Sequence, residues 1–219
     1  MPITLDPPKL ETPPRIDTRG PKSPPPALRD RGGGGGKAPA GEGRYRLGVW
    51  IGLASVVMVF SAFTSSLVVR KGLSDDWVSI QFPALMYVNT LVLIFSSATL
   101  ELAKRSLRRD NRPAFLRWWT TTTLLGAGFL AGQVVVWKQL AAAGIFLSSN
   151  PSSSFFYLLT AAHGVHLVGG ILALLGILIA AGRHRITARR RDPAEAAAIY
   201  WHFMDGLWVY LFVLLLVWR

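Results

Sequence analysis

Four ionisable side chains lie inside long apolar stretches of the sequence, and they are the residues best placed to do chemistry. His163 and His166 are three positions apart, as are His202 and Asp205. Residues at this spacing share one face of a helix, and two such histidines can ligate a metal ion or a haem. The pattern therefore permits a metal or haem site, a proton relay, or a hydrogen-bonded network that joins the helices.

We favour the hydrogen-bonded network. The two pairs lie at different depths in their helices, so they need not meet across an antiparallel hairpin. A relay needs ionisable groups at several depths, and residues 47–69 and 118–137 contain none. Asn89 and Gln133 are further candidates for hydrogen bonds between helices, because polar side chains in a membrane need a partner or a role.

Small residues indicate where helices approach each other closely. Gly48 and Gly52 are four positions apart, as are Gly128 and Gly132, and this spacing allows two helix backbones to come into contact. Gly164 is a further candidate for helix packing. Glycine is also common in membrane helices in general, so each single pair is weak evidence.

Five long stretches, each with at most one charged residue, must position these residues. At about 1.5 Å per residue, each can cross the roughly 30 Å hydrocarbon layer of a membrane as a helix. None carries the polar stripe of a helix in a soluble bundle, and all are longer than the roughly 9–11 residues of a spanning strand. The sequence predicts an all-α, polytopic membrane protein with a five-helix transmembrane bundle. The expected helices are residues 47–69, 77–100, 118–140, 154–182 and 196–218.

The composition supports this class. Of the 219 residues, 51% are hydrophobic and 16% are charged, against about 25% charged in a typical soluble chain. The absence of cysteine excludes disulfides, thiolate-ligated metals and a cysteine nucleophile. Residues 1–43 are rich in Pro and Gly without apolar periodicity, so we expect a disordered cytoplasmic tail there and the membrane domain in residues 44–219.

The net charge of +12 comes from basic residues that flank the apolar stretches. Most of the 24 Lys and Arg lie in the tail, between residues 104 and 117, and between residues 183 and 191. The positive-inside bias predicts a cytoplasmic N-terminus and a C-terminus outside, and an odd number of helices agrees with this. Because topology accounts for the basic loops, we expect no nucleic-acid partner.

Each expected helix contains a short motif. In chain order the motifs are R-L-G-V-W-I-G-L-A-S at 46–55, N-T-L at 89–91 with S-S-A-T at 96–99, L-G-A-G-F-L at 125–130 with G-Q at 132–133 and Trp137, S-F-F-Y-L-L-T at 154–160 with H-G-V-H-L at 163–167, and Y-W-H-F-M-D at 200–205 with Trp208. Together, in this order, they resemble subunit III of the haem-copper oxidases, the cytochrome c and quinol oxidase superfamily, in its five-helix bacterial form. The resemblance covers about Tyr45 to Trp218.

This resemblance implies a non-catalytic accessory subunit of a respiratory terminal oxidase in the bacterial cytoplasmic (inner) membrane. In the family, haem and copper reside in partner subunits, and subunit III packs against the catalytic subunit I in a complex that also contains subunit II. Its V-shaped bundle holds phospholipids in a cleft and supports O₂ reduction coupled to proton translocation. By resemblance, this chain has no catalytic, cofactor-binding or metal residues, and its four ionisable side chains are internal polar contacts.

The chain departs from the family pattern at two positions. Val56 and Val136 stand where family members often have Glu, so the role of those carboxylates does not transfer to this chain by resemblance. Two other functions remain open: a subunit-III-like protein associated with nitric oxide reductase, and a small proton-coupled membrane transporter. The electron donor, cytochrome c or quinol, is not determined by this chain, because that site lies on other subunits.

Overall fold

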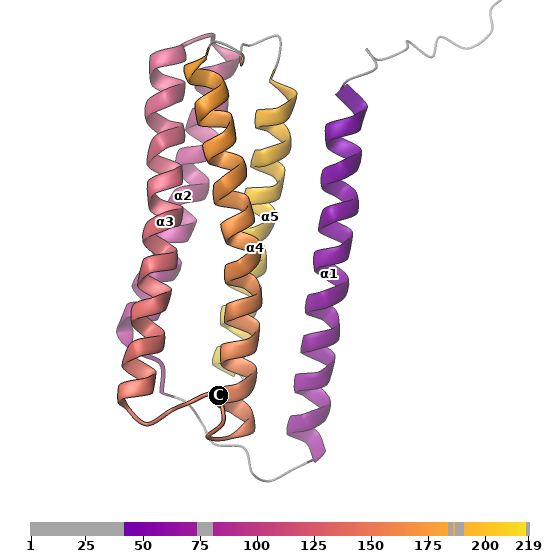
Figure 1. Cartoon of the computed structure of the whole chain (residues 1–219), viewed down its shortest axis with the longest axis vertical. Coiled ribbons are helices and arrows are strands. Elements are labelled where there is room, and N and C mark those ends of the chain that lie inside the picture. The colour runs from indigo at the N-terminus through magenta and orange to yellow at the C-terminus, as the bar shows by residue number, and fades with distance from the viewer. Residues whose placement is uncertain (1–41, 74–80, 184–185, 187–190, 218–219) are drawn as a thin grey trace, which may run out of the picture. The chain divides into compact units, whose positions relative to one another are not determined.

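The computed structural model describes residues 42–73, 81–183, 186 and 191–217, with side chains from residue 47 onward. Every regular element in these ranges is a helix, and five helices are long and apolar enough to cross a membrane. The prediction of an all-α, five-helix transmembrane bundle is confirmed. The predicted disordered tail lies outside the described residues, except for residues 42 and 43. The helices are α1 (Glu42–Leu73), α2 (Ala84–Arg108), α3 (Arg112–Ala142), α4 (Pro151–Gly182) and α5 (Asp192–Val217) (Figure 1).

Capping residues set the starts of α3 and α4. The Asn150 side chain accepts a hydrogen bond from the Ser153 backbone N–H at 2.9 Å, and the Ser153 hydroxyl accepts one from the Asn150 N–H at 3.2 Å. This capping box, with Pro151 in the first turn, begins α4 three residues before the predicted start. Asn111 likewise caps α3, which begins at Arg112 rather than at residue 118.

The predicted start of the second helix is wrong where it can be checked. Residues 81–83 are not helical, and α2 begins at Ala84 behind Pro83; residues 77–80 lie outside the described ranges. The helix then continues past Glu101 to Arg108. Uncharged stretches identify the part of a helix that fits the hydrocarbon layer, whereas charged residues extend the same helix into the interface.

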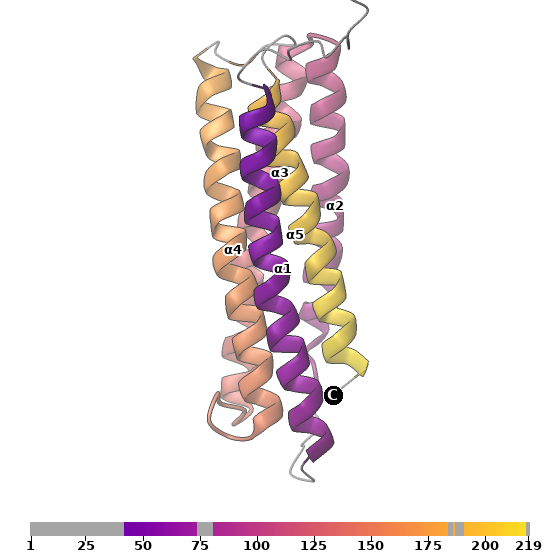
Figure 2. The same cartoon turned by 90° about the vertical axis from the view of Figure 1, so that its right-hand side faces the viewer.

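Helices α2 to α5 form a four-helix bundle in which α2 packs on α3, α3 on α4, α4 on α5 and α5 on α2. Helix α1 packs on α5 and touches α4, outside this bundle (Figures 1 and 2). The start of α1 and the end of α5 lie at opposite ends of the helices (Figure 1). This arrangement agrees with an odd number of membrane crossings.

The core between the helices is dominated by large side chains. Among the described residues, the fully buried aromatic side chains are Phe60, Phe115, Trp119, Phe129, Phe156, Trp201 and Trp208. Val56 and Val136, at the two positions where the resembled family often has Glu, are also buried. A valine at either site leaves no polar group that needs a partner, so burying it carries no desolvation cost.

Arg112 links the start of α3 to the end of α4 at one end of the bundle. Its guanidinium donates hydrogen bonds to the carbonyl oxygens of Ala181 at 2.9 Å and Gly182 at 3.2 Å, which lie in the last turn of α4. These carbonyls have no partner within their own helix, and a cation near them also interacts favourably with the helix dipole. The start of α3 is thereby fixed against the end of α4.

Candidate functional site: a polar seam between α2 and α5

The polar residues of two sequence motifs meet between α2 and α5. We call this set the α2–α5 seam. On α5, Trp201, Asp205 and Trp208 lie four and three positions apart, so they share one face. The seam consists of these three residues and His202 on α5 with Thr90, Ser96 and Ser97 on α2.

Both indoles of the seam are anchored by hydroxyl groups of α2. The Trp201 indole N–H donates to the Ser96 hydroxyl at 2.9 Å, and that of Trp208 donates to the Thr90 hydroxyl at 3.1 Å. The hydroxyl groups of Ser96 and Thr90 in turn donate hydrogen bonds to main-chain carbonyls of α2, at 2.7 and 2.9 Å. Every polar group in these two pairs is therefore satisfied, although both tryptophans are fully buried.

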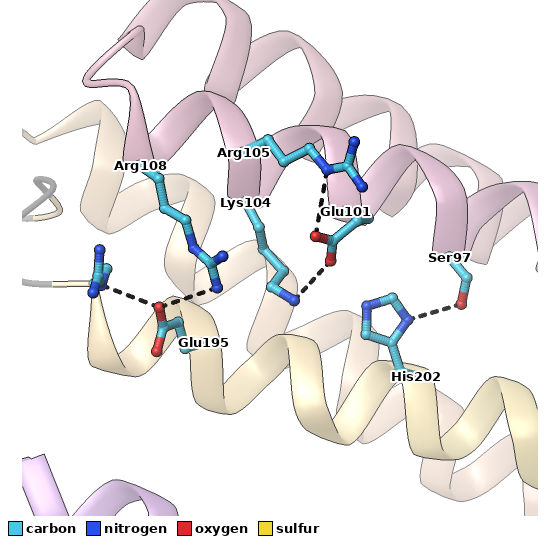
Figure 3. A network of polar contacts seen from close by, with 8 residues as sticks. Ser97, Glu101, Lys104, Arg105, Arg108, Glu195 and His202 are labelled. Carbon is cyan, nitrogen blue, oxygen red and sulfur yellow. Dashed lines mark hydrogen bonds and ion pairs between the residues drawn. The ribbon is translucent and has the colours of Figure 1, made fainter.

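Ser97 connects the two ionisable residues of the seam. Its hydroxyl donates to the Asp205 carboxylate. The same hydroxyl oxygen lies 3.0 Å from Nδ1 of His202, the contact that Figure 3 shows. Because the single hydroxyl proton is used toward Asp205, Nδ1 of His202 must be the donor to Ser97. The other carboxylate oxygen of Asp205 has no hydrogen-bond partner among the described residues.

Ion pairs lie next to the seam, where α2 ends and α5 begins. Lys104 and Arg105 approach Glu101 at 2.7 and 3.6 Å, while Arg191 and Arg108 approach Glu195 at 3.1 and 3.8 Å (Figure 3). The Arg108–Glu195 pair connects the two helices directly. Since these side chains are partly exposed, each pair is worth at most about 1 kcal/mol.

The histidine side chains of α4 form no hydrogen bond with the seam among the described residues, although the His163 ring packs against Trp208. His163 is fully buried, with its ring centroid 5.1 Å from that of Trp208 and 6.2 Å from that of Phe129. His166 Nδ1 lies 2.7 Å from the Ala162 carbonyl, and its ring meets Phe60 of α1. Within the described ranges no three His, Asp or Glu side chains are grouped closely enough to hold a metal ion. The structure thus joins His202 and Asp205 to α2 and leaves the α4 pair apart from them.

Asn89 on α2 and Gln133 on α3 differ in whether their amides have hydrogen-bond partners. The Asn89 amide donates a hydrogen bond to the Phe129 carbonyl at 2.9 Å, which joins α2 to α3. It also packs against Gly132, where an added Cβ would collide with the Asn89 amide. Gln133 is buried, and neither atom of its amide has a partner in the described part of the chain.

The predicted packing glycines fall into two groups. Gly132 meets Asn89, and a Cβ at Gly164 would meet only Leu130, at 4.0 Å. Added Cβ atoms at Gly48, Gly52 and Gly128 would meet no atom within 4 Å. The structure therefore makes no close helix contact at these three positions within its described ranges, because their open sides face away from the neighbouring helices.

Sequence reasoning did not single out Gly126, which together with Gly170 encloses Trp201. A Cβ at Gly126 on α3 would overlap the indole ring, and one at Gly170 on α4 would lie 3.2 Å from it. It also did not select Thr90, Ser96 and Ser97. A signal was present in the spacing: Thr90 and Ser96 lie six positions apart on one helix, and the two tryptophans that bond them lie seven apart on another.

Two apolar grooves lie beside α1. The larger, about 500 Å³, is bounded by α1, α4 and α5, and we call it the α1 groove. A second groove of about 330 Å³ lies between α1 and α5 and includes Phe60, Phe203 and Tyr210. Glycine and alanine on α4 and α5 keep the α1 groove open. Its lining includes Val49, Gly169, Gly176, Ile177, Ala197 and Tyr200.

Comparison with known proteins connects this arrangement to a family. The family model for cytochrome c oxidase subunit III matches residues 35–219. The chain is 31% identical to cytochrome c oxidase subunit 3 of Thermostichus vulcanus, over 78% of this chain and 86% of that protein. It is 30% identical to quinol oxidase subunit 3 of Bacillus subtilis (strain 168), over 76% and 83% of the two chains. A match that includes all five helices shows that this chain belongs to the cytochrome c oxidase subunit III family and is a multi-pass membrane subunit of a haem-copper oxidase complex.

Proposed function

We propose that the chain is a non-catalytic accessory subunit that stabilises subunit I of a respiratory oxidase, in a complex that includes subunit II. In this role it supports O₂ reduction coupled to proton translocation in the bacterial cytoplasmic membrane. The observation that carries the proposal is the α2–α5 seam: the polar residues of two motifs bond to each other and hold two helices together. Such an arrangement stabilises a bundle by joining two of its helices.

Purification in mild detergent tests this proposal. We expect a tagged copy of the chain to co-purify with a haem-copper subunit I that reduces O₂, together with a copper-binding subunit II. The chain isolated from that complex should show no haem absorption. Recovery with a nitric oxide reductase would contradict the proposal, and so would proton transport by the lone chain in liposomes.

We propose that the α1 groove holds a phospholipid acyl chain. Its walls are almost entirely apolar, so an acyl chain can pack against them through van der Waals contacts without leaving a polar group unsatisfied. Gly176 lines the groove, and an added Cβ there would meet no atom within 4 Å. A larger side chain at this position would fill the groove without overlapping the backbone of a neighbouring helix.

Gly176→Phe is therefore expected to reduce the number of phospholipids that remain bound to the purified complex, as measured by mass spectrometry of extracted lipids. Gly128→Phe is the matched control, because Gly128 is exposed on α3, outside the lining of the groove. Equal lipid content in the two variants would contradict a lipid in the α1 groove.

We propose that the N-terminus is cytoplasmic and the C-terminus is outside. The proposal is supported by the basic residues at the α2–α3 connection, which is the end where α1 begins (Figure 1). The chain has no cysteine, so single cysteines can be introduced directly. A membrane-impermeant maleimide applied to intact cells is expected to label Ala143→Cys in the α3–α4 connection and to leave Arg109→Cys unlabelled. The opposite pattern would reverse the orientation.

A further inference from the structure

His163 and Gln133 are buried in the four-helix bundle with hydrogen-bonding groups that no atom of the described residues satisfies. His163 is 0% exposed and Gln133 is 4% exposed. Neither ring nitrogen of His163 and neither amide atom of Gln133 has a partner among the described residues. An unsatisfied buried polar group costs about 1–3 kcal/mol, and native proteins keep few of them.

Contacts between α3 and α4 place these two residues at the same level. Phe129, Gln133 and Trp137 are four positions apart along one face of α3. The Phe129 ring lies against the His163 ring, and the Trp137 indole donates to the Thr160 hydroxyl at 3.2 Å. Because Thr160 and His163 are separated by about one turn of α4, these two contacts bracket Gln133. Gln133 therefore lies on the same face of α3 and at the level of the turn of α4 that carries His163.

The hydrogen-bond donors on residues near His163 and Gln133 already have other acceptors. The Thr160 hydroxyl donates to the Phe156 carbonyl at 2.7 Å, and the Asn89 amide donates to the Phe129 carbonyl. The Trp208 indole, which lies against His163, donates to Thr90. These side chains thus have other partners, and the imidazole and the amide are left with one another and with any small molecule between them.

We infer that His163 and Gln133 form a buried water site at the centre of the bundle, with one or two ordered water molecules bridging the imidazole and the amide. A neutral imidazole and an amide each present a donor and an acceptor, and water is the small ligand that both donates and accepts. Buried waters typically make about three hydrogen bonds to such groups. A metal ion fits less well, since one imidazole and one neutral amide supply too few ligands.

Radiolytic hydroxyl-radical footprinting of the intact complex in H₂¹⁸O tests the inference, because radicals formed from trapped water oxidise adjacent buried side chains. Trp208 and Trp119 are a matched pair: both are fully buried, and both indoles are hydrogen-bonded, but only Trp208 contacts His163. We expect several-fold more oxidation of Trp208 than of Trp119. Equal protection of the two tryptophans would overturn the inference.

A double-mutant cycle provides a second, independent readout. With a bridging water, His163→Phe or Gln133→Leu alone leaves the water and the remaining residue with too few partners, while the double variant removes the whole set. We therefore expect each single variant to lower the melting temperature of the complex and the double variant to recover much of the loss. The inference would be overturned if each single variant raised the melting temperature of the complex and the two increases added in the double variant. Coupling without enhanced oxidation of Trp208 would indicate a direct His163–Gln133 hydrogen bond and would also overturn it.

Discussion

Gly126→Ala is expected to destabilise the bundle by about 1–3 kcal/mol, which is typical of overpacking in a closely packed core. The new methyl group would overlap Cη2 and Cζ2 of Trp201. This ring cannot easily move away, because its indole N–H is bonded to Ser96 and its other side lies against the backbone at Gly170. The measurement is the fraction of this chain that stays in the purified complex during a thermal ramp.

Gly128→Ala is the control for this prediction. It adds the same methyl group to the same helix two residues away, where no atom lies within 4 Å. Alanine has a higher helix propensity than glycine by about 1 kcal/mol, so this variant should be neutral or slightly stabilised. Equal losses for the two variants would show that contact with Trp201 is not the cause.

Asp205→Ala is expected to weaken assembly or turnover of the complex without abolishing its haem content. The substitution removes the acceptor of the Ser97 hydroxyl in a buried seam, and leaving one such donor unsatisfied costs about 1–3 kcal/mol. The relevant measurements are the amount of this chain per subunit I, the O₂ turnover, and the haem absorption per complex. The haem should remain because no residue of the seam is proposed to hold it.

Asp205→Asn tests whether the hydrogen bond or the charge matters. The amide keeps an oxygen that can accept from Ser97, so assembly should largely recover relative to Asp205→Ala. Tyr210→Phe removes a bond to Thr64 on the exposed side of the same helix and should have a smaller effect. Complete loss of the haem spectrum in a fully assembled Asp205→Ala complex would contradict the proposed accessory role.

The positions of the membrane helices could be predicted from the sequence, but their ends could not. An uncharged stretch identifies the part of a helix that lies in the hydrocarbon layer of the membrane, and about 20 such residues are enough to cross that layer. The ends depend on caps and on charged residues that continue the helix into the interface. Thus α4 begins at Pro151 behind the Asn150 cap, and α2 continues past Glu101 to Arg108.

Which residues of the site share a helix face was also predictable, because spacing along one helix decides it. His202 and Asp205 had to share one face of α5, and both lie in the seam. The same rule does not say which neighbouring helix that face meets. The residues they contact, Ser97 above all, are more than a hundred positions away in the sequence.

The sequence by itself determined the number of membrane crossings, the approximate extent of each helix and the side chains that share a face, since all of these follow from local composition and helical periodicity. Only the tertiary structure decided that α5 bonds to α2, that Trp201 fits against Gly126 and Gly170, and that Gly48, Gly52 and Gly128 face outward. The reason is that rotation and pairing of helices in a bundle depend on how all their side chains fit together, and no spacing within one helix contains that information.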